Sequence, residues 1–190
     1  MRKLCITDCG NSDSQYAIDS FASELEFISS EINFTNTQIS CGGIKINKYS
    51  KFTMINSTFK NCYANCTNGG GFCYNLDKLG KEVDCDVSIT GCTFDHLVPS
   101  NGKVGMLNFF KSITISNCTI KSMPKAEYLL AIECVSEQEQ IILDKIIFIE
   151  NQTNISKNGS ECSLGLFISK AQRCIFQDCQ FIRNANIKEV

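Results

Sequence analysis

The feature that most constrains this chain is a short pattern of alternating apolar residues that recurs along its length. The clearest copy is Ser112–Ile120, S-I-T-I-S-N-C-T-I. With Ile120 taken as the anchor, further copies align at spacings of 25, 35, 26, 28 and 33 residues. Their anchors are Phe34, Phe59, Phe94, Phe148 and Phe181. Such a period predicts an architecture of stacked, equivalent repeats.

Each copy contains two pairs of apolar positions. In the clearest copy these are Ile113 and Ile115, followed by Cys118 and Ile120. A spacing of two within each pair is the period of a β-strand. The gap of three between the pairs would turn the second pair outward in a straight strand, so a bend is required. The bend falls three residues before the anchor, mostly at residues that tolerate the left-handed conformation: Glu31, Asn56, Gly91, Asn117, Lys145 and Asp178.

A third short apolar segment follows the anchor in most copies. These segments are Ile44–Ile46, Phe72–Tyr74, Met106–Leu107, Leu130–Ile132 and Leu166–Ile168. Three strands in each repeat leave no room for a crossover helix, which predicts a coil whose equivalent residues stack about 4.8 Å apart. We therefore expect an all-β chain, a parallel β-helix of about six coils of three short strands. Leucine-rich and helical repeats are disfavoured because their spacings are absent.

The chain is expected to form one elongated domain with a lead-in. Residues 1–24 fit the repeat poorly and are interpreted as an irregular lead-in or a partial N-terminal coil, with an incomplete turn built from Leu4–Ile6 and Tyr16–Phe21. Residues 25–190 form the repeat domain, with loop excursions at 76–84 and 151–161. Natural solenoids cover their end turns. Since no cap is visible after Phe181, we expect end-to-end self-association and a longer natural protein.

Composition excludes several classes of partner. The 18 basic and 20 acidic residues give a net charge of −2, with no basic stripe, so nucleic acid is not expected to bind. The longest apolar runs are too short to span a membrane. The N-terminus starts with basic residues but lacks the apolar stretch of a signal peptide.

Thirteen cysteines are a high count, typical of disulfide-rich secreted proteins. Cys92, Cys118 and Cys179 nevertheless share one inward position, where they are predicted to be buried thiols. Better disulfide candidates lie in or beside the expected turns: Cys62, Cys66, Cys73 and Cys85. The C-x3-C spacing of Cys62 and Cys66 lacks a matching second pair, so no metal site is predicted, and no cofactor.

Seven N-x-S/T sequons favour a secreted or surface chain. They lie at Asn33, Asn56, Asn65, Asn117, Asn151, Asn154 and Asn158. The last three belong to the polar excursion at 151–161. Asn151, Asn154 and Asn158 are therefore the most accessible glycosylation candidates.

Two short motifs resemble those of a known family. F-x-x-N occurs at Phe148–Asn151 and Phe181–Asn184, and G-G-I at Gly42–Ile44. Together they resemble the repeats of polymorphic outer-membrane proteins, within the pectin-lyase-like right-handed β-helix class, and similar cysteine-rich repeats occur in surface proteins of parasitic protists. The resemblance implies a right-handed coil, an extracellular or cell-surface location, and an adhesive role towards a host-surface protein or glycan.

Polysaccharide lyases and glycoside hydrolases share this fold, so catalytic residues were sought. The single histidine, His96, lies two residues after an anchor and is expected on the outer side or in the following turn. Asp84 and Asp86 are a carboxylate pair that could face alike on a strand, as hydrolysis or calcium binding would need. A solvated turn explains them better. No catalytic residue is predicted.

We therefore expect a non-catalytic module of a larger surface or secreted protein that takes part in adhesion or in ligand or glycan binding. The alternative is a carbohydrate-active β-helix enzyme, or a non-functional fragment of one. Three or more carboxylates gathered on one exposed sheet face would favour the enzyme. A face lined by Asn, Thr or Ser would favour the binding module.

Overall fold

The computed structural model describes most of the repeat pattern and leaves several connecting segments undescribed. The described residues are 5–7, 18–21, 24–33, 44–47, 51–61, 63–64, 72–74, 86–96, 98–99, 106–108, 112–122, 130–133, 139–154, 166–169 and 171–187. Every regular element among them is a β-strand. The described residues contain no helix that is long and apolar enough to span a bilayer. The excursion expected at 76–84 lies outside the described residues.

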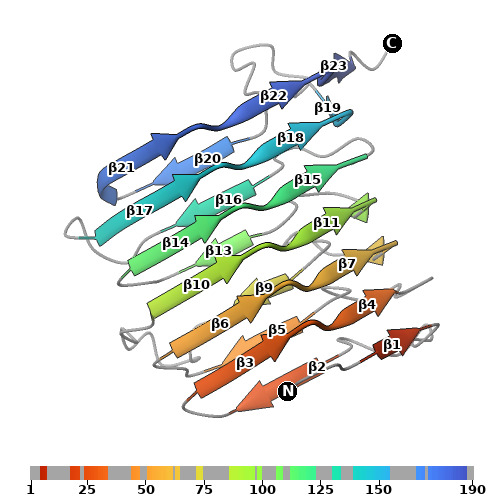
Figure 1. Cartoon of the computed structure of the whole chain (residues 1–190), viewed down its shortest axis with the longest axis vertical. Helices are drawn as coiled ribbons and strands as arrows, with labels where there is room; N and C mark the ends of the chain where they lie inside the picture. Colours follow the sequence, from red (N-terminus) through yellow and green to blue (C-terminus); the bar gives the residue numbers. More distant parts are fainter. Residues whose placement is uncertain are drawn as a thin grey trace.

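The strands form three main parallel sheets (Figure 1). Sheet A contains β3 (Glu24–Ile28), β6 (Lys51–Ile55), β10 (Asp86–Thr90), β14 (Ser112–Ser116), β17 (Glu139–Asp144) and β21 (Ala171–Gln177). Sheet B contains β1 (Cys5–Thr7), β4 (Glu31–Asn33), β7 (Thr58–Lys60), β11 (Thr93–Asp95), β15 (Thr119–Lys121), β18 (Ile147–Ile149) and β22 (Gln180–Ile182). Sheet C contains β2 (Ile18–Phe21), β5 (Ile44–Asn47), β9 (Phe72–Tyr74), β13 (Met106–Asn108), β16 (Leu130–Glu133) and β20 (Leu166–Ser169).

Successive repeats lie next to one another in every sheet. From β3 to β20 the chain adds a strand to sheet A, then to sheet B and then to sheet C in each of five successive repeats, and β21 and β22 add one further strand to sheets A and B. In Figure 1 the strands of sheet A lead into those of sheet B, and the strands of sheet C lie behind and point the opposite way. Two short pairs complete the set: β8 (Tyr63–Ala64) with β12 (Val98–Pro99), and β19 (Gln152–Asn154) with β23 (Ala185–Ile187).

The bend between sheets A and B lies at the predicted position. Asn56, Gly91, Asn117, Lys145 and Asp178 all have positive φ, between 48° and 66°. The Asn117 N–H donates to the Asp144 carbonyl at 2.9 Å, and the N–H groups of Asn56, Gly91 and Lys145 donate to the next repeat in the same way. The backbone hydrogen bonds therefore continue from repeat to repeat through the bend, which leaves few unpaired groups there.

The first copy of the repeat is in a different register from the one the sequence suggested. Leu25 pairs with Phe52 and Ile32 with Phe59, so the anchor is Ile32 and not Phe34. The bend residue is Ser29, with φ 50°, and not Glu31. A shift of two residues keeps every side chain on the same face of a strand, which is why the alternation alone could not choose between the two alignments.

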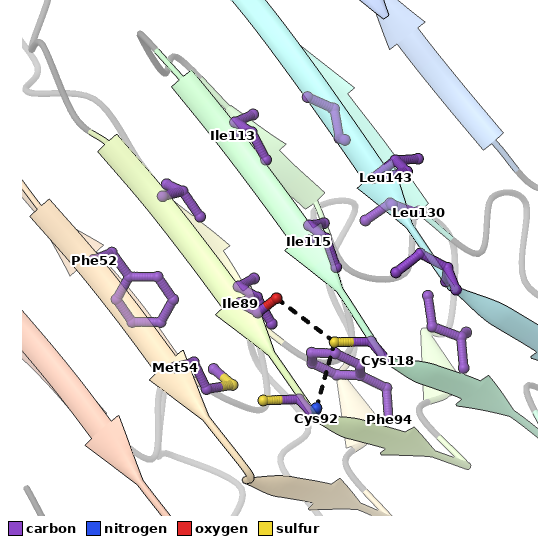
Figure 2. Packing of buried hydrophobic residues seen from close by; sticks show 14 of the residues in the cluster. Phe52, Met54, Ile89, Cys92, Phe94, Ile113, Ile115, Cys118, Leu130 and Leu143 are labelled. Carbon is purple, nitrogen blue, oxygen red and sulfur yellow. Dashed lines mark hydrogen bonds between the residues drawn. The ribbon is translucent and has the colours of Figure 1, made fainter. Parts of the chain in front are cut away.

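The core lies on the inward faces of the sheets. In the clearest copy Ile113, Ile115, Cys118 and Ile120 are all buried, as predicted, whereas Thr114 on the opposite face is half-exposed. Neighbouring repeats place such residues side by side, as Figure 2 shows for Ile89 and Ile115. Burying one such aliphatic or aromatic side chain contributes about 1.5–3 kcal/mol relative to leaving it in water. The stack of inward positions therefore holds the repeats together.

The first residues of the segment 151–161, predicted as an excursion, include a strand. Residues Gln152–Asn154 form β19, which pairs with β23 from the next repeat. The polar composition of this segment suggested a loop, but its backbone continues the parallel stacking. Residues 155–161 lie outside the described part of the chain.

Candidate functional site

A surface lined by hydroxyl groups covers the outer side of sheet A in its middle repeats. We call it the hydroxyl face. Because alternate residues of a strand point to opposite sides, the outward positions of β6, β10 and β14 lie between the core residues. They hold six half-exposed Ser and Thr side chains: Thr53, Ser88, Thr90, Ser112, Thr114 and Ser116.

The register of the strands makes this surface regular. Ser88 stands directly beside Thr114, and Thr90 beside Ser116. Parallel strands lie about 4.8 Å apart and outward residues of one strand about 6.6 Å apart, so the hydroxyl groups form a grid. Each hydroxyl can donate one hydrogen bond and accept others. The grid can therefore serve a ligand rich in hydroxyl or amide groups.

Hydrogen bonds across the strands orient part of the grid. The Ser112 hydroxyl donates to Asp86 Oδ1 at 2.6 Å. Thr90 Oγ1 and Ser116 Oγ lie 3.0 Å apart and share a hydrogen bond. A hydroxyl held by a neighbour loses less freedom when a ligand binds, which favours affinity.

The carboxylates on the outer side of sheet A are spread over three strands. Asp86 lies on β10 and Asp144 on β17, with β14 between them, while Glu24 and Glu26 lie on β3. Strands two apart are about 9.6 Å from one another. In the described part of the chain no three His, Cys, Asp or Glu side chains come close enough to hold a metal ion. The cluster of carboxylates that would favour the enzyme therefore does not form on the described strands of sheet A.

A shallow groove at the first strands of sheet A contains the closest pair of these carboxylates. It has a volume of ≈ 410 Å³ and is lined by Glu24, Leu25, Glu26, Lys51 and Thr53. Both glutamates are exposed on the same strand. Acid–base hydrolysis needs two carboxyl groups in contrasting environments, one of them shielded from water. The groove supplies two similar, solvated groups.

His96 lies in the second bend of its repeat, as its position after the anchor predicted. Its φ is 53° and its side chain is half-exposed. The His96 N–H donates to the Lys121 carbonyl at 3.1 Å. Neighbouring Asp95 is paired with Lys121, its Oδ2 lying 3.4 Å from Nζ. These contacts are typical of a turn at the protein surface. Asp84, the expected partner of Asp86, lies outside the described residues.

Asn151 is buried, which contradicts its selection as an accessible glycosylation site. Its side chain is 0% exposed. Nδ2 donates to the Ile120 carbonyl at 2.9 Å and to Asn184 Oδ1 at 2.9 Å. Asn184 in turn donates to the Phe148 carbonyl at 2.8 Å. The F-x-x-N motif thus forms an asparagine ladder that satisfies backbone carbonyls after the anchors.

The other glycosylation candidates divide between described and undescribed positions. Asn154 belongs to the backbone of β19, and Asn158 lies outside the described residues. The exposed sequon asparagines of the described part are instead Asn56 and Asn117, at the bends between sheets A and B. The sequence predicted the left-handed conformation of these two residues, but the exposure of their side chains was not predicted.

The shared cysteine position holds stacked thiols, as predicted for Cys92 and Cys118, whereas Cys179, which was also expected to be buried, is half-exposed. Cys92 and Cys118 are both free and buried. The Cys92 N–H donates to Cys118 Sγ at 3.3 Å, and the Cys118 thiol lies 3.8 Å from the Ile89 carbonyl (Figure 2). The side-chain hydrogen bond with the Cys92 thiol, followed by burial, raises the pKa of Cys118, and the Cys92 N–H acts in the opposite direction. A thiol held neutral is a poor nucleophile and a poor metal ligand, so the role of Cys118 is structural.

Serine takes the same position in the earlier repeats and makes the same contacts. The Ser30 N–H donates to Ser57 Oγ at 3.2 Å, and the Ser57 hydroxyl donates to the Ile55 carbonyl at 3.0 Å. Ser30, Ser57, Cys92, Cys118 and Cys179 all bond from this position to the backbone carbonyl two residues earlier, whereas Ile146 fills the same position with an apolar side chain. The side chains of the disulfide candidates Cys62, Cys66, Cys73 and Cys85 are not described.

Comparisons of the sequence with models of protein families, with curated proteins and with solved structures found no match. The site is accordingly defined by its own geometry. The hydroxyl face could have been found from the sequence, because aligning the repeats places Thr53, Ser88 and Thr114 in one outward column. The predictions from the sequence concerned the inward residues and did not include this outward column.

Proposed function

We propose that this chain is a right-handed parallel β-helix that serves as a non-catalytic binding module of a cell-surface or secreted protein. Its ligand is a neutral glycan on a host surface, and the hydroxyl face is the binding surface. The family behind this proposal is the polymorphic outer-membrane protein-like repeat of the pectin-lyase-like class. The observation that carries the binding function is the grid of Ser and Thr side chains across β6, β10 and β14.

The topology supports a right-handed coil. The path from a strand of sheet A through sheets B and C to the next strand of sheet A connects two parallel neighbours. Connections of this kind are right-handed in about 98% of cases, because strands of L-amino acids twist in one direction. The asparagine ladder of Asn151 and Asn184 supports the family proposal, since it accounts for the F-x-x-N motif.

The chemistry of the face fits a neutral sugar. Sugar hydroxyls both donate and accept hydrogen bonds, as do Ser and Thr. Asp86 accepts a hydrogen bond from Ser112 and so adds a charged acceptor at the border of the grid. A solvent-exposed grid without a deep cleft binds weakly, which suits adhesion through many copies on a surface.

The exposed sequons at Asn56 and Asn117 support a secretory route. When the chain is produced in a secretory host, glycan mapping should find Asn56 or Asn117 modified and Asn151 unmodified. Modification of Asn151 in the folded chain would contradict its place in the ladder.

The binding proposal is tested by removing hydroxyls from the centre of the grid. Ser88→Ala combined with Thr114→Val keeps the size of the side chains and deletes two neighbouring hydroxyls. Each lost neutral hydrogen bond costs about 0.5–1.5 kcal/mol, so affinity for a glycan selected on an array should fall about tenfold. Isothermal titration calorimetry measures this change.

The matched control is Thr93→Val on sheet B, where Thr93 is also half-exposed and belongs to no sequon. It should leave affinity unchanged. No binding to a broad glycan array, or equal losses in the two variants, would overturn the proposal. Release of new reducing ends from the bound glycan, abolished by Glu24→Gln or Glu26→Gln in the groove, would establish the carbohydrate-active alternative instead.

A further inference from the structure

The groove on β3 and β6 lies next to the hydroxyl face and shares Thr53 with it. Thr53 lines the groove and is also the outward residue of β6 that stands beside Ser88 on β10. On its other side the register neighbour of Thr53 is Glu26 of β3. In Figure 1 the strands β3, β6 and β10 follow one another across sheet A. A ligand that lies across the strands of the hydroxyl face therefore reaches the groove without a change of direction.

The chemistry of the groove differs from that of the hydroxyl face. Lys51 stands in register between Glu24 of β3 and Asp86 of β10, and all three side chains are exposed. A lysine ammonium donates hydrogen bonds, and an ionised glutamate accepts them. Hydrogen bonds of charged groups are about twice as strong as those between neutral groups. The groove therefore offers a ligand stronger hydrogen bonds than the Ser and Thr grid does.

An apolar strip borders the groove on the side of the bend. Ile28 and Ile55 are outward residues of β3 and β6, they stand side by side in register, and both are half-exposed. They lie two positions after Glu26 and Thr53, which is about 6.6 Å along the strands. The C–H groups of a sugar ring are apolar, and sites for small ligands combine apolar contacts with a few polar groups. Charged groups beside an apolar strip therefore suit a sugar ring.

We propose, on the basis of the proposed binding function, that the groove holds the terminal sugar of the neutral glycan whose inner sugars lie on the hydroxyl face. A terminal sugar keeps a hydroxyl that an inner sugar loses to its further linkage, so it can present two vicinal hydroxyls. They donate to the Glu24 or Glu26 carboxylate and accept from Lys51, while the C–H groups of the ring pack on the apolar strip. The groove volume of ≈ 410 Å³ lies within the range of about 300–1,000 Å³ that is typical of ligand sites.

The charge of the groove selects against acidic sugars. Its lining contains the carboxylates of Glu24 and Glu26 but a single ammonium group, that of Lys51. A terminal sugar that carries a carboxylate would be repelled by the glutamates, and such repulsion discriminates between ligands without any added contact. The groove thus gives the binding module a specificity that uncharged hydroxyl groups do not supply.

The experiment compares a neutral trisaccharide selected on the glycan array with its dideoxy derivative, which lacks both vicinal hydroxyls of the terminal sugar. Isothermal titration calorimetry on the whole chain gives Kd, and circular dichroism confirms that each variant is folded. Lys51→Met and Glu24→Gln should each raise Kd for the trisaccharide about tenfold, because each removes a hydrogen bond of a charged group. The native chain should bind the dideoxy derivative at least about tenfold more weakly, and neither substitution should weaken that binding further.

The matched controls are Glu31→Gln on β4 and Lys145→Met at a bend. They make the same changes of charge at exposed positions outside the groove. Both should leave Kd for the trisaccharide unchanged.

Groove variants that bind the trisaccharide as tightly as the native chain would overturn the groove as a subsite. If Ser88→Ala with Thr114→Val still weakens binding in that case, the hydroxyl face stands without the groove. Equal affinity for the dideoxy derivative would overturn recognition of the terminal sugar, and tighter binding of a trisaccharide with a carboxylated terminal sugar would overturn the selection by charge. Absence of binding to every glycan of the array would overturn the proposed function and the groove together.

Discussion

The repeat of β14 and β15 and the repeat of β21 and β22 have the same pattern but differ in burial. Ile115 and Ile120 are buried in the middle repeat, whereas their counterparts Phe176 and Phe181 are about half exposed in the last. The last repeat is no less apolar in sequence. β14 has a described strand on both sides and β21 on one. The number of neighbouring strands does not decide burial alone, because β3 is also a terminal strand of sheet A and its Leu25 and Phe27 are buried. The inward positions are therefore uncovered at the β21 end of the sheet and covered at the β3 end.

The bends between sheets A and B, unlike the inward positions, do not differ between these two repeats. Asn117 in the middle repeat and Asp178 in the last have φ values of 52° and 51°. The backbone conformation depends on the residues of the repeat itself, and it is the same with one neighbour or two. Local geometry is thus uniform along the chain, while the energy of packing changes at the edge. The predictions below test that contrast.

The largest difference in stability is expected when each of two stacked phenylalanines is replaced by Ala in turn. The rings of Phe148 and Phe181 are 4.6 Å apart, but only Phe148 is fully buried. Phe148→Ala should cost about 3–5 kcal/mol of unfolding free energy, because it leaves a cavity. Phe181→Ala should cost about 1–2 kcal/mol, since half of that ring is already in water. Urea denaturation measures both, and equal losses would show that the last repeat is covered.

The next effect is a difference in cysteine reactivity between the two repeats. Cys118 is fully buried and the side-chain hydrogen bond with the Cys92 thiol raises its pKa, while Cys174 is exposed on β21. Only thiolates are alkylated readily. At mildly alkaline pH iodoacetamide should modify Cys118 at least about a hundredfold more slowly than Cys174, because Cys118 must first open to solvent. Mass spectrometry of labelled peptides gives the rates.

Addition of denaturant provides the control for that measurement. In the unfolded chain the two cysteines should react at similar rates. Rapid labelling of Cys118 under native conditions would contradict its burial, and a disulfide between Cys92 and Cys118 would contradict the stacked thiols.

The smallest effect is expected at the bends, and it should be the same in both repeats. Asn and Asp tolerate the left-handed conformation better than Ala, for which it costs about 1 kcal/mol. Asn117→Ala and Asp178→Ala should therefore each lower the unfolding free energy by about 1 kcal/mol. Thermal denaturation followed by circular dichroism compares them. A neutral Asp178→Ala beside a costly Asn117→Ala would mean that the last bend does not form.

Much of the fold could be predicted because it depends on the pattern of residues within short segments. Alternation at a period of two identified the strands, and the gap of three identified the bend, down to residues such as Gly91 and Lys145. The first repeat was misaligned by two residues, since Phe34 and Ile32 are both apolar and lie on one face of a strand. Pairing of Ile32 with Phe59 in sheet B resolved the choice.

The candidate site was less predictable for a physical reason. Ser88 and Thr114 are 26 positions apart in the chain, and they form one surface only because β10 and β14 pair in register. Asn151 shows the same dependence. Its sequon suggested an exposed loop, but contacts with Ile120 and Asn184, in the repeats on either side, bury it.

The sequence by itself determined the strand period, the three strands of each repeat and the left-handed bends, because each depends on residues within one repeat. The tertiary structure alone decided which inward side chains stay exposed, which hydroxyls form a grid and which asparagine is enclosed. Those properties depend on the stacking of one repeat on the next, where residues about 26 to 36 positions apart come together. Local steric preferences are encoded in short segments, whereas burial is a property of neighbours that only the folded chain supplies.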